Sequence, residues 1–480
     1  MLSERGERDL SAFVGFPLVV NTTSLLADDS QHWTRVGLDQ VFNVDWSLAD
    51  SGVWRLYHLQ SAVEQHTVEE RTSTAFGMTT PLRRSRLFSY DQALFGGEAT
   101  LQKNIQTNSV LHRIVYGLEL ESARIEEKRT GFEENLNDGS ITDNIGGEQL
   151  PTRDFPNSDI FQAGLYVQDE IVFPDERWRL IGGLRLEYYD LNPDPDPIFE
   201  ANNPADPVGT TDTSVSPKLG ALYHLDDAQS FYGHYVHGFR APPFNDVNFG
   251  LALLDLGFIA LPNPDLKPET VNGFELGYRY DTPTSRAAVS FFYNDYDDFI
   301  ESRVNQGVDP DTGFIVFQSV NRTEAVIYGA EFRGEWDISR LLPGEGNWKV
   351  RGILALAAGE DRERDEALNS IDPPEAVLGL HYEKHRWGVA SYLTMVDGKE
   401  ARDADQSAEE LFLPGGYGTL DLLGYYNFNE QVRLNWGLYN LFDRKYWSWA
   451  DVRGLPADDP DLERFTAPGR NVSVTLTVDW

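Results

Sequence analysis

The sequence has no cysteine, no long apolar run and few basic residues. Without cysteine the chain can form no disulfide and offers no thiolate for catalysis. No stretch approaches the roughly 18 consecutive apolar residues of a transmembrane helix, and the mean hydropathy is -0.42. Lys and Arg number 40 against 77 Asp and Glu, so the formal net charge is -37. This charge argues against nucleic acid as a partner and against simple adhesion to anionic lipid heads, because both need a basic face.

A secretory leader is also missing from the first ten residues, which contain no basic segment, apolar core or cleavage site. Either the chain is cytoplasmic or its true N-terminus lies upstream, and a membrane barrel requires the second. We assign residues 1–30 only as an uncertain stretch that belongs to the early part of the domain formed by 31–480.

The clearest pattern lies at residues 471–480, where apolar and polar side chains alternate without a break. One face carries Val472, Val474, Leu476, Val478 and Trp480. Period two predicts an extended strand with unlike faces, and about ten residues suffice for a tilted strand to cross a bilayer. The segment resembles the closing strand of an outer-membrane β-barrel, in which the terminal aromatic serves as an assembly signal. An edge strand of a soluble β-sandwich would show the same pattern.

Similar alternation recurs along the chain in roughly 17 segments, which predicts antiparallel strands with one polar and one apolar face. The connections alternate between tight turns, such as 174–176 and 226–228, and long stretches, such as 130–157 and 241–269. Short turns at one end and long loops at the other are typical of outer-membrane barrels. Aromatic residues make up 12% of the chain, as girdles of aromatic side chains would require.

Four motifs between residues 164 and 446 resemble those of TonB-dependent outer-membrane receptors. They are Phe239-Arg240-Ala241-Pro242, Asn263-Pro264-Asp265-Leu266, the paired segments 164–170 and 182–187, and Asn440-Leu441-Phe442-Asp443 with Tyr446. The resemblance covers about residues 85–480. It implies an all-β transmembrane barrel, which has 22 strands in intact receptors. The plug domain and the energy-coupling box that precede the barrel in this family are not evident, so we interpret the chain as the barrel portion of a larger receptor.

The motifs also single out residues at the predicted barrel mouth. Arg240 ends a strand that runs toward the long loops, and its guanidinium can pair with an anionic ligand or with a loop carboxylate. The further candidates for ligand binding or for bracing the loops are Pro242, Phe244, Asn263, Glu269 and His237. The apolar stretch 249–261 between the two boxes predicts a short lid helix on the mouth, or a contact with an apolar ligand or a protein partner.

The resemblance implies uptake of haem or an iron–siderophore chelate, driven by the TonB energy-coupling complex acting through the plug. The family's haem receptors place a ligand histidine between the two boxes, and this sequence has none there. Outer-membrane lipid and the barrel assembly machinery are further implied partners; no cofactor is implied. A passive porin is the alternative, followed by a soluble extracellular β-protein. Enzyme motifs with Gly-x-Ser-x-Gly, His-Glu-x-x-His or phosphate-binding glycine patterns are absent from the sequence.

Overall fold

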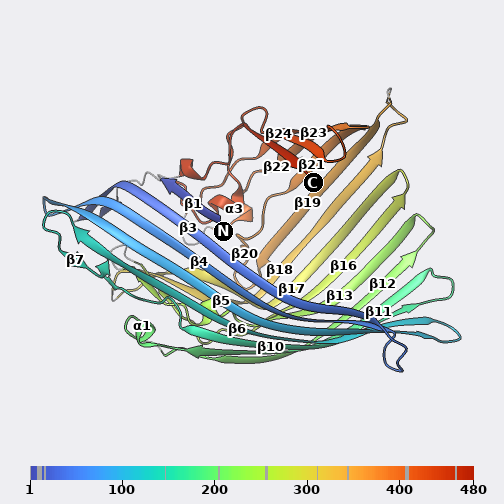
Figure 1. Cartoon of the computed structure of the whole chain (residues 1–480), viewed down its shortest axis with the longest axis horizontal. Coiled ribbons are helices and arrows are strands. Elements are labelled where there is room, and N and C mark those ends of the chain that lie inside the picture. The colour runs from blue at the N-terminus through green and yellow to red at the C-terminus, as the bar shows by residue number, and fades with distance from the viewer. Residues whose placement is uncertain are drawn as a thin grey trace.

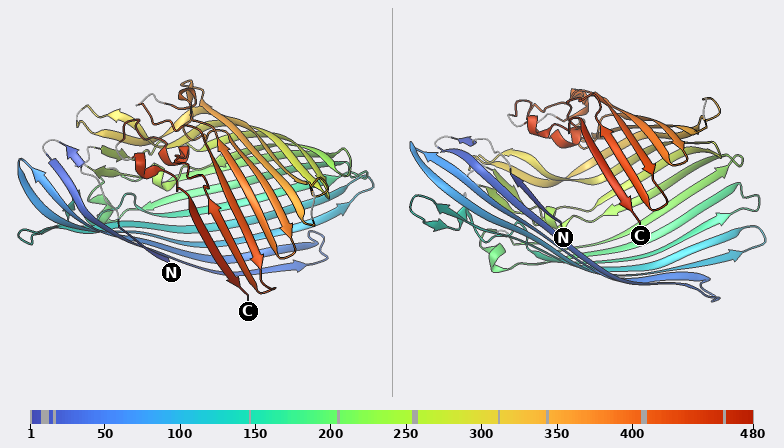
Figure 2. Two further views of the ribbon diagram at one scale, coloured as in Figure 1. Left: turned by 90° about the horizontal axis from the view of Figure 1, so that it is seen from above. Right: turned by 45° about the horizontal axis from the view of Figure 1, so that its top comes forward.

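A computed structural model shows one large β-sheet that curls into a trough (Figures 1 and 2). It describes residues 2–7, 13–15, 18–145, 147–203, 206–253, 258–310, 312–342, 345–405, 410–459 and 462–479. The long strands, in their order across the sheet, are β3 (Leu18–Asn43), β4 (Ser51–Ala75), β5 (Met78–Gln106), β6 (Leu111–Asn135), β10 (Asn157–Val172), β11 (Trp178–Asp194), β12 (Thr210–His224), β13 (Gln229–Arg240), β16 (Glu269–Thr282), β17 (Ser285–Val308), β18 (Ile315–Asp337), β19 (Asn347–Asp361), β21 (Glu375–Lys384), β22 (Trp387–Val396), β23 (Tyr417–Asn427), β24 (Val432–Tyr439) and β25 (Asn471–Val478).

Shorter elements decorate this sheet. The short strands are β1 (Leu2–Glu7), β2 (Phe13–Gly15), β7 (Ile141–Thr142), β8 (Asn144–Ile145), β9 (Glu148–Gln149), β14 (Leu251–Leu253), β15 (Phe258–Leu261) and β20 (Glu366–Ala367). The helices are α1 (Pro197–Glu200), α2 (Phe244–Val247), α3 (Trp449–Val452), η2 (Ala401–Asp403) and η3 (Leu462–Phe465). Among the described residues, no helix has the length and apolar character needed to cross a membrane.

The first strand beside β3 is formed by two pieces. β1 pairs Leu2 with Gln31, and β2 pairs Phe13 with Val20. The residue numbers in both pairs add to 33, so β1 and β2 share one register and form a single interrupted strand. At the other edge of the sheet, β25 pairs with β24 alone within the described ranges. The trough is therefore open between its first and last strands (Figure 2).

Apolar side chains face outward and form a continuous belt. Along β25, the exposed fraction is 65% for Val472 and 59% for Leu476, and neither is covered by a second layer. The same outward face of neighbouring strands carries the half-exposed residues Leu165, Leu186, Val215, Phe274, Leu276, Phe291, Leu354, Leu378 and Leu393. This arrangement excludes a β-sandwich, in which these side chains would be dry. Trp480, the predicted assembly signal, lies outside the described residues.

Aromatic pairs border this belt on both sides. Near the short turns they are Trp178–Tyr223, Phe231–Tyr278, Phe332–Trp336, Trp348–Tyr382, Tyr382–Trp387 and Tyr426–Phe428. Toward the long loops, Phe161 contacts Tyr188. The ten residue steps from Trp178 to Tyr188, at about 3.3 Å each and a tilt of about 40°, span about 25 Å, the height of an outer-membrane apolar band.

The opposite face of the same strands is polar and lines the lumen. Arg185 forms ion pairs with Glu119 at 2.7 Å and with Glu187 at 2.9 Å. Tyr57 donates a hydrogen bond to Glu121, and Arg351 donates one to Glu335. Alternation along each strand thus gives an apolar wall toward lipid and a charged wall toward the lumen, as the sequence predicts.

Four strands rise far beyond the belt on the long-loop side, at the left of Figure 1. We call these parts, residues 18–36, 58–75, 78–95 and 122–135, the wing. Its surfaces are joined by cross-strand ion pairs: Arg83 contacts Glu70 at 2.9 Å and Glu134 at 3.4 Å, and Arg84 contacts Glu133 at 2.7 Å on the other face. Because ion pairs lie on both faces, the wing stands in water.

Three long loops on the opposite side of the mouth are fastened together, two of them through a small apolar core. Ala404, Leu411, Trp449 and Val452 are buried together. The indole nitrogen of Trp449 donates to the carbonyl oxygen of Asn369, and the Lys399 ammonium lies 4.8 Å from the centroid of the same indole ring. Loops 362–374, 397–416 and 440–470 therefore form one folded unit.

Candidate ligand-binding mouth

The end of β13 brings the first sequence motif to the rim of the lumen. Arg240 is the last residue of the strand, and its side chain is 55% exposed. Pro242 follows and is almost fully buried. Proline cannot donate to the β-ladder, so the strand stops here. Phe244 then begins α2 and contacts Phe155 edge-on, with ring centroids 5.0 Å apart. These contacts hold the start of loop 241–268 against loop 136–156.

A buried carboxylate fastens the same loop to two other strands. Asp246 is 4% exposed. Its Oδ1 accepts a hydrogen bond from the Ser319 hydroxyl at 2.7 Å, and its Oδ2 accepts one from Ser302 at 3.1 Å. Ser302 lies on β17 and Ser319 on β18, so one side chain joins three segments. Hydrogen bonds to a charged group are stronger than neutral ones, and they compensate the desolvation of this carboxylate.

The second motif secures the far end of the loop. The Asn263 side chain donates to the carbonyl oxygen of Ser319, and its Oδ1 accepts from the backbone N–H of Asp265. Leu266 is buried with Val247 and Ile300. Glu269, which begins β16, accepts a hydrogen bond from the backbone N–H of Ile300. Its nearest contact with the Arg240 guanidinium is 3.8 Å. The two boxes thus brace both ends of loop 241–268 on β17 and β18.

A cluster of buried charges connects the wing to loop 136–156. Arg129 on the inner face of the wing pairs with Glu148 and Asp154. The Glu127 carboxylate accepts the backbone N–H of Asp154 at 2.8 Å. Burial, together with the nearby charge of Asp154, raises the pKa of Glu127 to about 7. Burial also raises the pKa of Glu148 and of Asp154. This cluster therefore changes its charge near neutral pH.

Neighbouring contacts extend that bracing around the mouth. Arg153 pairs with Asp196 of loop 195–209 at 2.9 Å. The backbone N–H of Gly250 donates to the Asp154 carbonyl at 2.7 Å. Asn248 exchanges two hydrogen bonds with the backbone of Val208. Loops 136–156, 195–209 and 241–268 are consequently linked to one another and not only to their own strands.

A cavity of about 500 Å³ lies on the lumen wall directly below Arg240. Its lining includes Tyr57, Glu121, Arg185 and Tyr189, together with Arg240 itself. The two guanidinium groups come from β11 and β13. Since Glu119 and Glu187 already pair with Arg185, the half-exposed Arg240 is the cation with more freedom to meet an entering anion.

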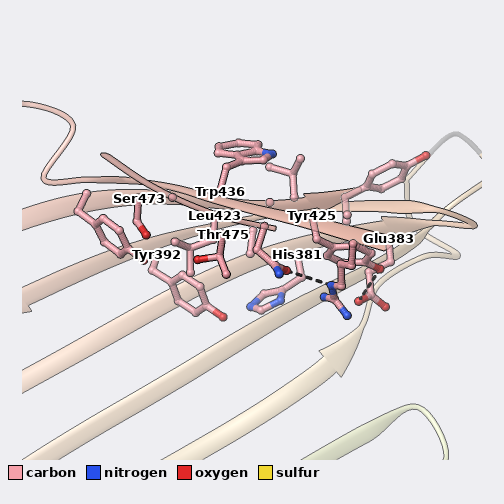
Figure 3. Close-up of a pocket in the computed structure, with 17 residues that line it drawn as sticks. His381, Glu383, Tyr392, Leu423, Tyr425, Trp436, Ser473 and Thr475 are labelled. Carbon is pink, nitrogen blue, oxygen red and sulfur yellow. Dashed lines mark hydrogen bonds between the residues drawn. The ribbon is translucent and has the colours of Figure 1, made fainter. Parts of the chain in front are cut away.

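A second hollow, of about 350 Å³, lies on the lumen side of the last strands. In Figure 3, Tyr392 and His381 point to one side of the sheet and Trp436 to the other. The Arg433 guanidinium lies 4.3 Å from the centroid of the Tyr425 ring and donates to Asn435. This hollow belongs to the polar lumen wall and is separate from the mouth.

The structure distributes the predicted residues over two faces. Arg240, Pro242, Phe244, Asn263 and Glu269 all lie at the base of loop 241–268. His237 shares the outward face of β13 with Tyr235, and its Nδ1 lies 3.1 Å from Oδ1 of Asn272. It therefore points away from the cavity that Arg240 borders. None of these positions tests ligand binding, which stays a prediction.

Two parts of the mouth differ from, or were missed by, the sequence analysis. The predicted lid helix in 249–261 is wrong within the described residues: β14 and β15 form a hairpin there, and β15 pairs in parallel with β18. A continuous apolar run does not distinguish a helix from a buried strand. Asp246 and Glu127 were not predicted, because their partners lie far away in sequence and no local pattern marks them.

A family model described as "TonB dependent receptor-like, beta-barrel" matches residues 7–441. The hemoglobin-haptoglobin utilization protein B of Neisseria meningitidis serogroup C is 27% identical over 279 residues, which is 50% of this chain and 34% of that protein. The chain thus spans about a third of the length of the curated relatives it matches.

Solved structures match over nearly the whole chain. The FrpB iron transporter from Neisseria meningitidis (F3-3 variant) has a TM-score of 0.61 at 11% identity, covering 97% of this chain and 78% of that one. Copper transporter OprC has a TM-score of 0.59 at 18% identity, covering 100% and 81%. At these identities the likeness establishes the fold alone.

Proposed function

The chain belongs to the TonB-dependent receptor family, whose members are transporters and not enzymes, and from this premise we propose that it takes up an iron-bearing ligand. Its barrel lies in the outer membrane of Gram-negative bacteria, as the family does. The proposed ligand is haem or an iron–siderophore chelate. Support for haem comes from a relative named for hemoglobin-haptoglobin utilization, and support for iron from a structural neighbour named as an iron transporter.

The main support for this proposal is that the loops at the mouth are fixed to one another above a polar cavity. Loops 136–156, 195–209 and 241–268 are fixed to one another by buried side chains. A passive pore has no need for such a rigid entrance. A cavity of about 500 Å³ below it is within the range of small-molecule sites.

Arg240 is the proposed contact for an anionic group of that ligand. Haem and ferric chelates carry carboxylate or other anionic oxygens, which a guanidinium binds through paired hydrogen bonds. Pro242, Asn263 and Glu269 are proposed to hold this side chain in place and not to touch the ligand, since each is engaged with the protein. His237 faces the other way and is not proposed as a contact.

The test of this contact is the affinity of the full-length receptor for haemin in vesicles. Arg240→Ala is expected to weaken binding about 10- to 100-fold, since hydrogen bonds to a charged group contribute about 1.5–3 kcal/mol. Arg240→Lys should recover part of the loss. The matched control is His237→Ala, three residues away on the outward face. Equal affinities for Arg240→Ala and the wild type would remove Arg240 from the site.

Energy coupling is the second part of the proposal. The TonB complex would act through a plug domain, which the described residues do not contain. Iron-starved cells that express the full receptor are expected to accumulate the ligand only when the TonB complex is intact. Uptake that is indifferent to that complex would contradict the proposal. Insertion is proposed to depend on the barrel assembly machinery and on outer-membrane lipid.

A further inference from the structure

The tip of the wing stands far from the membrane and from the cavity. Register connects Phe161 to Ser122, Ser122 to Phe95 and Phe95 to His58, which places Phe95 near the level of the upper aromatic pair. Met78, at the start of β5, lies 17 residues beyond Phe95, or roughly 58 Å along the strand at about 3.4 Å per residue. A small ligand in the cavity cannot touch this tip.

An unusual residue occupies the turn at the tip. Ala75 pairs with Met78, which leaves Phe76 and Gly77 as a two-residue turn between β4 and β5. Both have a positive φ, 51° for Phe76 and 81° for Gly77, as a type I′ turn requires. Asn or Asp usually precedes glycine in this turn because they tolerate the left-handed region. A bulky aromatic side chain is strained there, and strain of this kind points to a role outside folding.

Exposure and charge give the tip a distinct surface. The side chain of Phe76 is 80% exposed and that of Met78 is 73% exposed. Residues 72–81 contain no charged side chain, and Thr and Ser flank the two apolar residues. The rest of the wing carries cross-strand ion pairs. The chain as a whole has a formal charge of -37. A neutral apolar tip can therefore meet a protein surface where the acidic loops would be repelled or remain hydrated.

We propose that the Phe76–Met78 tip docks on a folded protein that carries the ligand, with the Phe76 ring seated in an apolar depression of that protein. The inference rests on the proposed function and adds the class of partner. A free chelate would bind in the cavity, which the tip does not reach. The outer leaflet lies at the level of the Phe161–Tyr188 pair, well below the tip. An exposed aromatic side chain that fills a pocket is a common anchor of protein interfaces.

The experiment separates folding from docking because the same substitution moves them in opposite directions. In the full-length receptor in vesicles, Phe76→Asn places a favoured residue in the turn, so protection of residues 72–81 from hydrogen exchange should rise. Binding of haem-loaded haemoglobin is expected to weaken at least tenfold. Binding of free haemin should stay unchanged. Met78→Ser provides a second variant, and Leu341→Asn is the control, since Leu341 is 79% exposed in the short-turn connection 338–346 at the opposite end.

Each outcome decides something. Unchanged haemoglobin affinity in Phe76→Asn overturns the docking role, and so does an equal loss for haemoglobin and haemin. A wild type that binds haemin but not haemoglobin overturns this inference and leaves the proposed function standing. A wild type that binds neither, in iron-limited membranes or in vesicles, overturns this inference and counts against haem as the ligand in the proposed function. If Phe76→Asn lost adhesion to added lipid vesicles but still bound haemoglobin, the tip would be a lipid contact and the inference would be overturned.

Discussion

Removing the buried Asp246 carboxylate should release loop 241–268 while leaving the sheet intact. Asp246→Ala deletes the two hydrogen bonds from Ser302 and Ser319 and leaves the buried Ser319 hydroxyl without its acceptor. Hydrogen bonds to a charged group contribute about 1.5–3 kcal/mol each, so a loss of about 3 kcal/mol in local stability is a conservative figure. At about 1.4 kcal/mol per tenfold change, the opening equilibrium rises roughly 150-fold.

Hydrogen exchange of residues 244–248 is the appropriate measurement, because it reports local opening that does not unfold the strands. Asp246→Asn keeps one acceptor oxygen and should fall between the wild type and Asp246→Ala. Asp265→Ala is the matched control, since Asp265 is an exposed acid in the same loop. Exchange that rises less than threefold in Asp246→Ala would refute the view that this carboxylate fastens the loop.

Three further predictions follow from other parts of the molecule. Burial raises the pKa of Glu127 from its usual 4.5 to about 7, so the stability that protonated Glu127 gives to loop 136–156 is full below about pH 4.5 and is lost as the pH rises to about 7. Hydrogen exchange near Asp154, corrected for intrinsic rates, should therefore rise with pH over this range, by at most about tenfold per pH unit. Glu127→Gln should abolish this pH dependence. Leu354 faces lipid, so Leu354→Arg should destabilise the folded barrel by about 2–4 kcal/mol and lower its urea midpoint. The preceding residue, Ile353, faces the lumen, so Ile353→Arg should change the urea midpoint little. Trp449→Ala should destabilise the apolar core of loops 397–416 and 440–470 by about 3–5 kcal/mol and make 397–416 susceptible to limited proteolysis. Phe442→Ala should do neither, because Phe442 is already 74% exposed.

The sequence predicted the barrel wall well, because lipid on one side and water on the other impose strict alternation. Roughly 17 alternating segments were expected, and the described residues contain 17 long strands at these positions. Strand lengths in the wing could not be predicted: β4 continues far beyond the belt, to Ala75. Above the membrane both faces of β4 are polar, so alternation disappears although the ladder continues, and only pairing across strands reveals it.

At the mouth, sequence motifs located the correct loop but not the interactions that hold it. Arg240 and Glu269 could be placed because they stand at the ends of alternating strands. Asp246 could not, since Ser302 and Ser319 are 56 and 73 residues away and become its neighbours only after β17 and β18 pair. The extended conformation of Phe258–Leu261 was missed for a similar reason: it is determined by pairing with Ile315–Gln318 on β18, and no feature within the apolar run itself reveals that partner.

The open side of the trough has a consequence for any segment that completes it. The outer edge of β25 presents a row of backbone N–H and C=O groups beyond its bonds to β24. Hydrocarbon offers no substitute partners, so this row acts as a template that must be matched along its whole length. Matching fixes the phase of the incoming strand, because a shift by one residue would turn its oily side chains into the channel and its hydrophilic ones into the bilayer. The edge therefore selects strands by the alternation of apolar and polar residues and not by a particular sequence. Unrelated strands with this alternation should be able to pair with it.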